Sequence, residues 1–427
     1  MIALSEHRLL RLVVLCALYT AQGIPFGFLT ITLATYLAGE GLDSAAIGAI
    51  AMAATIPWGF KWVWGPFVDR FGSTRFGRRR PWILAAQTGM IGTLAAMATI
   101  PDPAAALPLL TWLVIAHNVF NSLQDVCVDA LAVDLLPPED RGKASGFMYG
   151  SKYIGTAIGG AGLSLVVDGI DLRAAFIAMI ILIAAIGLLP LLTRERPAIT
   201  TGPVHPHDSP GPEADAPSSV IGLLLAVAAA FARPPAIFTA IAALLATTAS
   251  GLLSPIGTVL FVQELGWTEV EYATMTGGAA VLAGLGGAVG GGLLADAMGP
   301  RRVVAGCSLL LGGLLMSFAW MLETPLLEDR GLLWSYTLLE SALLGAINAA
   351  FFAVCFGVSR PVVAATQFTA YMALMNLGVA LAQGQAGRIE LELGTRGAWI
   401  LAATIQLSVV ALMPLTRLKG SKTRFSS

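Results

Sequence analysis

Long apolar stretches separated by short polar turns run along most of this chain. Roughly 20 apolar residues in a helix are needed to cross the hydrocarbon core of a bilayer. This measure predicts twelve spans, at about 10–38, 44–68, 81–100, 108–136, 144–167, 172–193, 234–262, 269–295, 303–322, 331–357, 365–388 and 398–416. The pattern therefore predicts an all-α integral membrane protein with twelve transmembrane helices.

The stretch after the sixth predicted span has a different character. Residues 194–219 hold six prolines among Gly, Ser, Thr and acidic residues, a composition typical of a linker. The apolar run 220–232 has only 13 residues and ends before two prolines, which favours a helix lying at the membrane interface. We expect an N-terminal six-helix bundle at 1–193, a cytoplasmic Pro-rich linker with an interfacial helix at 194–233, a second bundle at 234–416 and a basic cytoplasmic tail at 417–427.

A short repeat supports this division into two halves. The pattern GxxxDxxG follows the second span as Gly65, Asp69 and Gly72, and it follows the eighth span with Asp296 at its centre. Arginines come after both copies, including Arg301 in the second half. Parallel repeats about an axis along the membrane normal recur in transporters, so we expect two pseudo-symmetric bundles.

Charge placement predicts the orientation. The chain is 56% hydrophobic and 12% charged, with a net charge of −1 that gives no reason to expect a nucleic-acid partner. If both termini are cytoplasmic, nineteen of the 25 Lys and Arg residues lie on that side and four lie outside. Because basic residues favour the cytoplasmic side, this asymmetry predicts a multi-pass protein with both termini in the cytoplasm.

Catalytic and metal-binding patterns are missing from the sequence. Four scattered histidines and four cysteines in apolar segments show no ligand spacing and no nucleophile–base arrangement. We therefore expect no enzyme activity, no cofactor and no metal. A membrane receptor, the other alternative to a carrier, would be expected to carry a folded soluble domain, and the long loop here has the composition of a linker.

Four charged residues fall inside predicted spans: Lys61, Asp125, Asp129 and Lys152. A charge in the bilayer centre costs roughly 2.5–3.5 kcal/mol on insertion scales, so these groups must face protein or water. Counted at a rise of about 1.5 Å per residue, they lie at similar depths from the cytoplasmic side. We expect a lysine–carboxylate cluster in which Asp125 and Asp129 carry a coupling proton, while Lys61 and Lys152 neutralise them or bind an anionic group of the solute. The alternative is a permanent ion-pair network that fixes helix packing.

Other polar residues in the spans are candidates for lining the same route. On span four, Asn118 and Asn121 share a helix face with the two aspartates, and Tyr149 shares one with Lys152. The full set of candidate lining residues is Gln22, Asn118, Asn121, Gln124, Tyr149, Glu340, Asn348 and Asn376. The alternative for these side chains is an ordinary hydrogen bond between helices.

The motifs also carry a family resemblance. The repeat after span two, followed by Arg78-Arg79-Arg80, resembles the loop signature of the major facilitator superfamily. Residues 60–70 and 76–82, with Gln124-Asp125, Asp129, Asp134 and Arg141, are similar to the AmpG-type muropeptide permeases, a group related to acetyl-CoA transporters and siderophore permeases. This resemblance implies a proton-coupled symporter of the bacterial inner membrane, working as a monomer with a small solute, protons and the lipid bilayer as its partners. It implies import of a muropeptide by alternating access, with a siderophore or another anionic metabolite as the alternative substrate.

The resemblance assigns a second role to the loop residues. It implies that ion pairs at the cytoplasmic surface hold the outward-facing state. The residues of this expected cytoplasmic gate are Gly65, Asp69, Arg70, Gly72, Arg78, Arg79, Arg80, Asp134, Arg141, Asp296 and Arg301. The alternative is that the arginines only set topology and contact anionic lipid headgroups.

Overall fold

The computed structural model describes residues 2–71, 77–196, 226, 228–360 and 363–417. Within these residues the chain is almost entirely helical, apart from a two-residue parallel pairing of β1 (Ile2–Ala3) with β2 (Thr193–Arg194). This pairing ties the start of the chain to the end of its sixth span.

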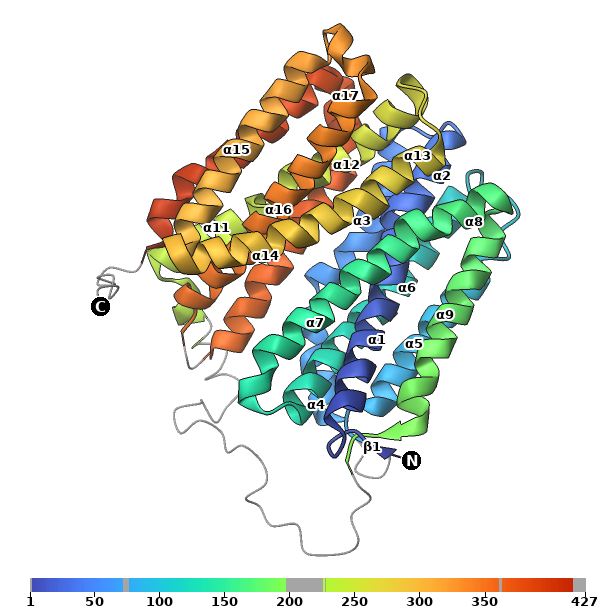
Figure 1. Ribbon diagram of the computed structural model, residues 1–427, viewed down its shortest axis with the longest axis vertical. Coiled ribbons are helices and arrows are strands. Elements are labelled where there is room, and N and C mark those ends of the chain that lie inside the picture. The colour runs from blue at the N-terminus through green and yellow to red at the C-terminus, as the bar shows by residue number, and fades with distance from the viewer. Residues whose placement is uncertain (1, 72–76, 197–225, 227, 361–362, 418–427) are drawn as a thin grey trace, which may run out of the picture.

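The first half contains six helical segments that run alternately up and down the molecule (Figure 1). Their elements are α1 (Arg8–Gly27), η1 (Phe28–Thr32) and α2 (Leu33–Gly39); α3 (Ser44–Gly59), η2 (Lys61–Val63) and α4 (Trp64–Arg70); α5 (Arg80–Met97); α6 (Leu107–Leu135); α7 (Pro138–Ala157), η3 (Ile158–Gly162) and α8 (Leu163–Gly169); and α9 (Leu172–Leu192). The segments η1 and η3 are π-helical turns within longer helices.

The second half repeats this arrangement. Its elements are α11 (Pro234–Leu245), α12 (Thr248–Val259) and η5 (Leu260–Glu264); α13 (Glu269–Ala273), η6 (Thr274–Ala279) and α14 (Ala280–Met298); α15 (Pro300–Met321); η7 (Pro325–Glu328); α16 (Arg330–Val358); α17 (Ala364–Leu412); and η9 (Met413–Thr416). The label α17 covers two antiparallel helices, because Gly394 at φ +71° reverses the chain between them. Glycine tolerates this left-handed conformation at no steric cost.

Each of the twelve predicted spans corresponds to one of these helical segments, so the predicted fold class is confirmed. By length and composition, eight helices of the described chain could cross a membrane, with the two helices of α17 counted as one. The segments 80–97, 107–135 and 138–169 complete the set, and the last two carry three of the four intramembrane charges, Asp125, Asp129 and Lys152. Of the expected interfacial helix at 220–232, Ala226 and residues 228–231 are helical and Ala232 is in a turn, whereas 220–225 and 227 lie outside the described residues, as does most of the linker.

Each half packs around its own apolar core, and the halves meet mainly along α3 and the first helix of α17. The buried clusters of the first half draw on α1 to α9 and are joined by Val259 of α12, and the large cluster of the second half draws on α11 to α17. Glycine lets the halves approach closely: a Cβ added to Gly48 would lie 2.3 Å from the carbonyl oxygen of Gln383, and one added to Gly387 would lie 2.4 Å from the Cα of Ala45. The junction is therefore packed backbone against backbone.

The molecule has two distinct ends. β1 lies at the bottom of Figure 1 and the red end of the last helix lies at its left, on the side that we call the terminal end. The turns beside α2, α8 and α13 lie on the opposite, upper right side, which we call the far end. Every helical segment connects these two ends, so depth along a segment can be compared between helices.

Candidate transport site

Lys61 and Asp125 form an ion pair inside the first half. Lys61 Nζ lies 2.8 Å from Asp125 Oδ2, and the two side chains are only 17% and 5% exposed. The ammonium is in place because α3 ends at Gly59 and the chain continues as the short turn η2, whose first residue is Lys61. Asp125 comes from the middle of α6, so the ion pair joins the second and fourth spans.

The second carboxylate has a different partner. Asp129 lies one turn further along α6, where the hydroxyl of Tyr19 on α1 donates a hydrogen bond to Asp129 Oδ1. The ring of Tyr149 packs edge-on against Tyr19, with ring centroids 5.7 Å apart. One carboxylate is thus held by an ammonium and the other by a phenol, although the two share a helix face.

Lys152 on α7 lies against aromatic rings. Its Nζ is 4.5 Å from the ring centroid of Trp58 and 5.9 Å from that of Phe26, distances at which a cation is attracted to a ring face. Lys152 also interacts electrostatically with Asp125, Asp129 and Lys61. All four predicted charges therefore belong to one cluster.

Polar residues of α6 hold the surroundings of this cluster in place. Trp58 Nε1 donates to Asn118 Oδ1 at 3.2 Å, and Trp64 Nε1 donates to Ser122 Oγ at 3.1 Å. These two bonds fix the indole rings of the second span against the fourth span. For Asn118 the role seen in the structure is orientation of Trp58, the aromatic residue beside both lysines.

The remaining candidates of the first half tie α6 to α1. Gln124 Nε2 donates to the backbone oxygen of Leu18 at 3.1 Å, and Asn121 Nδ2 donates to that of Gln22 at 3.5 Å. The side chain of Gln22 is fully buried, and within the described residues its amide has no hydrogen-bond partner. For Asn121 and Gln124, these hydrogen bonds between helices fit the alternative of helix packing more closely than a role in lining the solute route.

The candidates from the second half are spread out. Asn376 Nδ2 donates to the backbone oxygen of Trp58 at 3.5 Å, so Asn376 reaches across the junction to the cluster. Glu340 on α16 lies beside Tyr272 and Tyr336 within the second half, apart from the four charges. Asn348 is partly buried on the same helix, and its side chain forms no hydrogen bond with the residues that the structure describes.

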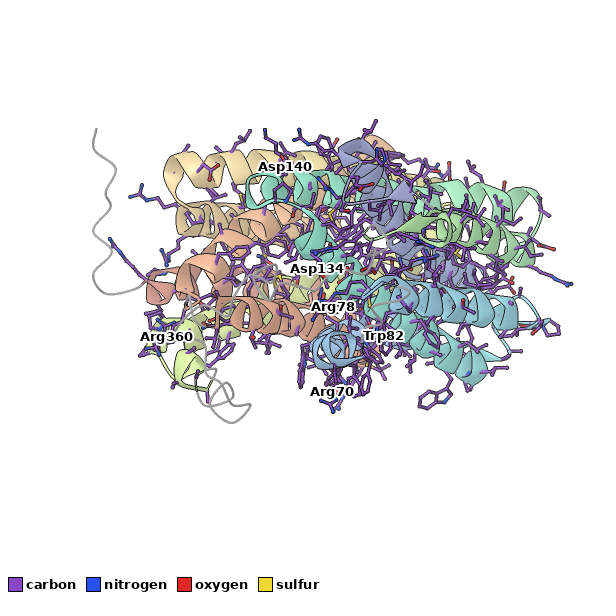
Figure 2. All side chains as sticks on the ribbon, turned by 90° about the horizontal axis from the view of Figure 1, so that it is seen from below. Arg70, Arg78, Trp82, Asp134, Asp140 and Arg360 are labelled. Atoms are coloured by element: carbon purple, nitrogen blue, oxygen red, sulfur yellow. The ribbon has the colours of Figure 1, made fainter. Side chains whose placement is uncertain are left out.

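The terminal end brings together part of the expected gate, including Arg78 and Asp134 (Figure 2). Arg79 Nε donates to Asp134 Oδ2 at 2.9 Å, and this arginine is 5% exposed. The backbone N–H groups of Arg78, Arg79 and Arg80 all donate to the carboxylate of Glu195, at 2.6–2.8 Å. Glu195 therefore caps the start of α5, and all of these contacts stay within the first half.

Other gate candidates have different surroundings. Arg70 is exposed and lies over the ring of Phe71, and a Cβ added to Gly65 would meet open space. Arg301 donates to Thr416 from both Nε and a terminal nitrogen, at 3.0 and 3.1 Å, and Asp296 is exposed. Gly72 and the side chains of Asp69 and Arg141 lie outside the described residues.

The residues of this site that were not singled out from the sequence include Tyr19, Trp58 and Glu195. Trp58 precedes Lys61 by three residues, so helical spacing places its ring near the lysine, and this signal was available. In the sequence, Tyr19 is one residue in the long apolar stretch of the first span. Its pairing with Asp129 depends on how α1 packs on α6. Glu195 lies in a segment whose composition indicates a linker.

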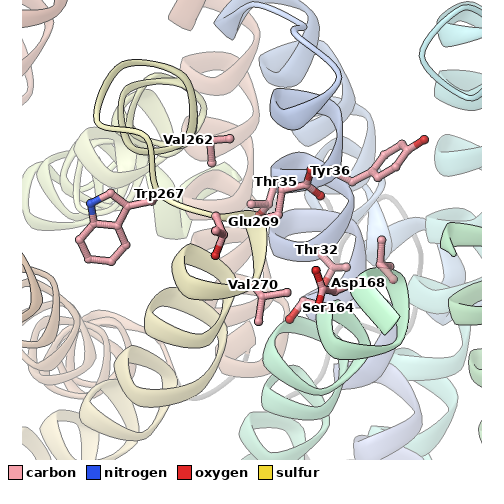
Figure 3. Close-up of a pocket in the computed structure, with 11 residues that line it drawn as sticks. Thr32, Thr35, Tyr36, Ser164, Asp168, Val262, Trp267, Glu269 and Val270 are labelled. Carbon is pink, nitrogen blue, oxygen red and sulfur yellow. The ribbon is translucent and has the colours of Figure 1, made fainter. Parts of the chain in front are cut away.

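A separate pocket of about 420 Å³ opens at the far end, between the halves (Figure 3). Tyr36 of α2, Asp168 of α8 and Glu269 of α13 are among the residues that line it, and none of the four clustered charges does so. Within the described chain, no group of three or more His, Cys, Asp or Glu side chains could hold a metal ion.

Membrane-crossing helices in two packed halves, with charges buried beside their junction, define a polytopic solute transporter. A profile described as Major Facilitator Superfamily matches residues 12–383, and the chain belongs to this superfamily. It is therefore a multi-pass membrane transporter, as the sequence motifs imply.

Individual relatives indicate which group of this superfamily the chain resembles. The chain is 31% identical over 155 residues to the anhydromuropeptide permease of Escherichia coli (strain K12), and this match covers 36% of the chain and 31% of that permease. It is 26% identical over 324 residues to the putative transporter AmpG 4 of Rickettsia felis, covering 71% and 72% of the two chains. The expected resemblance to AmpG-type permeases is thereby confirmed at modest identity.

Solved structures confirm the fold. The chain matches a crystal structure of the nucleoside transporter NupG with TM-score 0.71 and 16% identity, covering 95% of this chain and all of that one. It matches a D-xylose–proton symporter with TM-score 0.71 and 13% identity, covering 94% and 97%. A bacterial homologue of the lysosomal transporter Spinster, in an inward-facing and occupied conformation, gives TM-score 0.72 at 14% identity, covering 96% and 97%.

Proposed function

We propose that this chain is a proton-coupled permease that imports a muropeptide across the bacterial inner membrane, with both termini in the cytoplasm. The observation that carries the proposal is the buried ion pair of Lys61 and Asp125 beside a second carboxylate, Asp129. Charged groups within membrane spans are costly to maintain, so a cluster of four is expected to serve the transport cycle.

The coupling follows from competition within the cluster. While both aspartates are ionised, they attract the two lysines and leave little net positive charge for an anionic solute. A proton bound by one aspartate removes one negative charge, so the cluster gains net positive charge and attracts the solute. Release of the proton restores the carboxylate, which then competes with the solute for the ammonium groups and favours solute release.

Alternating access would expose this cluster to one side at a time. In the arrangement described here, hydrogen bonds and glycine contacts join the halves at the far end, which the distribution of basic residues assigns to the outside. We propose that the return to the outward-facing state opens these contacts. The exposed gate residue Arg70 of the terminal end would then reach a partner in the other half, whereas Arg79 and Asp134 stay paired within the first half.

The substrate assignment rests on the relatives. The Escherichia coli protein is described as an anhydromuropeptide permease, although the matched region covers 31% of its length. Lysines in a membrane site suit any anionic solute of similar size, so a siderophore belongs in the same test.

Uptake into proteoliposomes tests the proposal. Labelled anhydromuropeptide should accumulate under an inward-directed proton gradient and stop accumulating when a protonophore collapses the gradient. Ferric siderophore offered in parallel should not accumulate. Asp125→Asn and Asp129→Asn should lose gradient-driven uptake, while Glu392→Gln, which neutralises an exposed carboxylate of α17, should keep it. Accumulation that is indifferent to the gradient would refute proton coupling, and accumulation of the siderophore alone would refute the muropeptide assignment.

A further inference from the structure

The two lysines of the cluster have different surroundings. Lys61 Nζ lies 2.8 Å from Asp125 Oδ2 and has its counter-ion in place. The ammonium of Lys152 forms no hydrogen bond and no ion pair with any part of the chain that the structure describes, and it lies 4.5 Å from the ring centroid of Trp58. Asp125, one of the two carboxylates of the cluster, is thus already paired with the other lysine.

An ammonium group has three N–H donors and no acceptor. A ring face attracts the charge but does not replace the acceptors that water would provide, so a partly buried lysine on aromatic rings still has donors to offer. Trp58 and Phe26 therefore hold Lys152 in place without neutralising it. Asp129, the other carboxylate of the cluster, accepts its hydrogen bond from Tyr19.

The position of Trp58 places this lysine at the junction of the halves. Asn376 of the second half donates to the backbone oxygen of Trp58 at 3.5 Å, and the Trp58 ring is the surface on which Lys152 lies. A solute held between the halves would therefore meet Lys152 beside Trp58. Lys61 remains tied to α6 through Asp125.

We propose that Lys152 binds a carboxylate of the transported solute, with Trp58 as its positioning residue, while Lys61 acts as the counter-ion of Asp125. This inference rests on the proposed function, and it names the group of the solute that the site recognises. It predicts selectivity for acids over their neutral esters, since an ester keeps the size of the acid and loses the charge that the ammonium attracts.

Equilibrium binding to the purified full-length protein in detergent tests this assignment without requiring transport. The probes are an anhydromuropeptide with free carboxylates and its methyl ester, together with a carboxylate siderophore and its methyl ester. For the wild type we expect the acid of at least one pair to bind at least about tenfold more tightly than its ester. Lys152→Gln should remove this preference and leave ester binding unchanged, and Lys152→Arg should retain most of it.

Lys61→Gln is the matched control, because it removes a lysine from the same cluster. It should keep the preference for acid over ester while weakening gradient-driven uptake. An unchanged ester affinity in Lys152→Gln shows that the variant is folded, and a monodisperse elution profile checks this independently. Loss of ester binding together with acid binding in a monodisperse Lys152→Gln protein would show a general structural role and overturn the assignment.

The remaining outcomes separate this inference from the function on which it rests. If only the siderophore acid is preferred and Lys152→Gln abolishes that preference, the role of Lys152 stands and the muropeptide assignment falls. If Lys152→Gln keeps the preference, or if the wild type prefers neither acid to its ester, the assignment to Lys152 is overturned, whatever the substrate.

Discussion

The two ends of the molecule are held together in different ways. At the far end the halves bind each other: Ser44 donates to Glu390, and Gln263 donates to the backbone oxygens of Ala38 and Leu42 at 2.9 and 2.8 Å. At the terminal end the described polar contacts stay within one half, as between Arg79 and Asp134. Contacts between the halves depend on the conformational state, whereas contacts within a half are kept when that half moves as a rigid body.

This difference separates two kinds of residue. Residues of the far end that join the halves should change the balance between states when they are altered. Residues of the terminal end that bind within a half should change stability and leave the balance nearly untouched. The expected gate motif belongs in part to the second kind in the arrangement seen here.

The largest effect is expected from Gly160→Val at the far end. A Cβ on Gly160 would lie 2.8 Å from the Cα of Gly277 in the other half, so a larger side chain should keep the halves apart. We expect uptake to fall at least about tenfold, since about 1.4 kcal/mol suffices for that change. In a background without the four native cysteines, spin labels at the exposed positions Asp102 and Glu328 should move further apart.

Gly162→Val is the control for this substitution, since the nearest atoms to an added Cβ lie 3.9 Å away. It should leave the label distance as in the wild type. If Gly160→Val also leaves the distance unchanged, the far end does not close by the contact of Gly160 with Gly277.

A smaller shift is expected from Ser44→Ala, which removes the donor to Glu390. Glu390 keeps its second donor, Thr395 Oγ1 at 3.2 Å, so we expect a loss of about 1 kcal/mol. The ratio of closed to open far ends should fall about fivefold in the same label measurement. Thr395→Ala should shift the ratio less, because Thr395 binds Glu390 from the same half, and an equal or larger shift would contradict the comparison of the two ends.

Asp134→Asn should lower stability without moving the far end. The substitution replaces a charge-assisted hydrogen bond to the buried Arg79 with a neutral one, which we expect to cost about 1–2 kcal/mol. The thermal unfolding midpoint should drop, and the distance between the labels at the far end should stay as in the wild type. A changed label distance with an unchanged midpoint would instead show that Asp134 controls the balance of states.

The most local effect is expected from Glu195→Ala. This change removes the carboxylate that accepts from three backbone N–H groups at the start of α5, a capping contact expected to contribute about 1 kcal/mol. Amide hydrogen exchange at residues 78–80 should become faster, while exchange at the N-terminal turn of α15 stays unchanged. Equal exchange rates in wild type and variant would show that Glu195 does not cap α5 in solution.

Much of the fold follows from the sequence because the spans are long and continuous. The chain must satisfy its backbone hydrogen bonds inside the bilayer, so about 20 apolar residues predict a helix directly. The second span shows the limit of this argument: an apolar stretch predicts one helix at 44–68, and the structure ends α3 at Gly59 and places Lys61 in a separate turn. The apolar content of the stretch does not predict this break, although Pro57 and Gly59, two residues that disfavour a continuous helix, come just before it.

The candidate site was predictable as a set of charges but not as a set of pairs. Depth along the spans places Lys61, Lys152 and the two aspartates at one level. Which lysine meets Asp125 depends on the rotation of three helices about their axes, and spacing along one helix does not determine that rotation. The same limit hides Tyr19, whose hydroxyl finds Asp129 only once α1 is packed against α6.

Proton movement during solute uptake tests the central claim most directly. In weakly buffered proteoliposomes, addition of anhydromuropeptide should make the outer solution more alkaline as protons enter with the solute. We expect this change to disappear in Asp125→Asn and Asp129→Asn and to persist in Glu392→Gln. Solute-dependent alkalinisation of wild-type size in both aspartate variants would contradict the account, because it would place the coupling proton outside the cluster of Lys61, Asp125, Asp129 and Lys152.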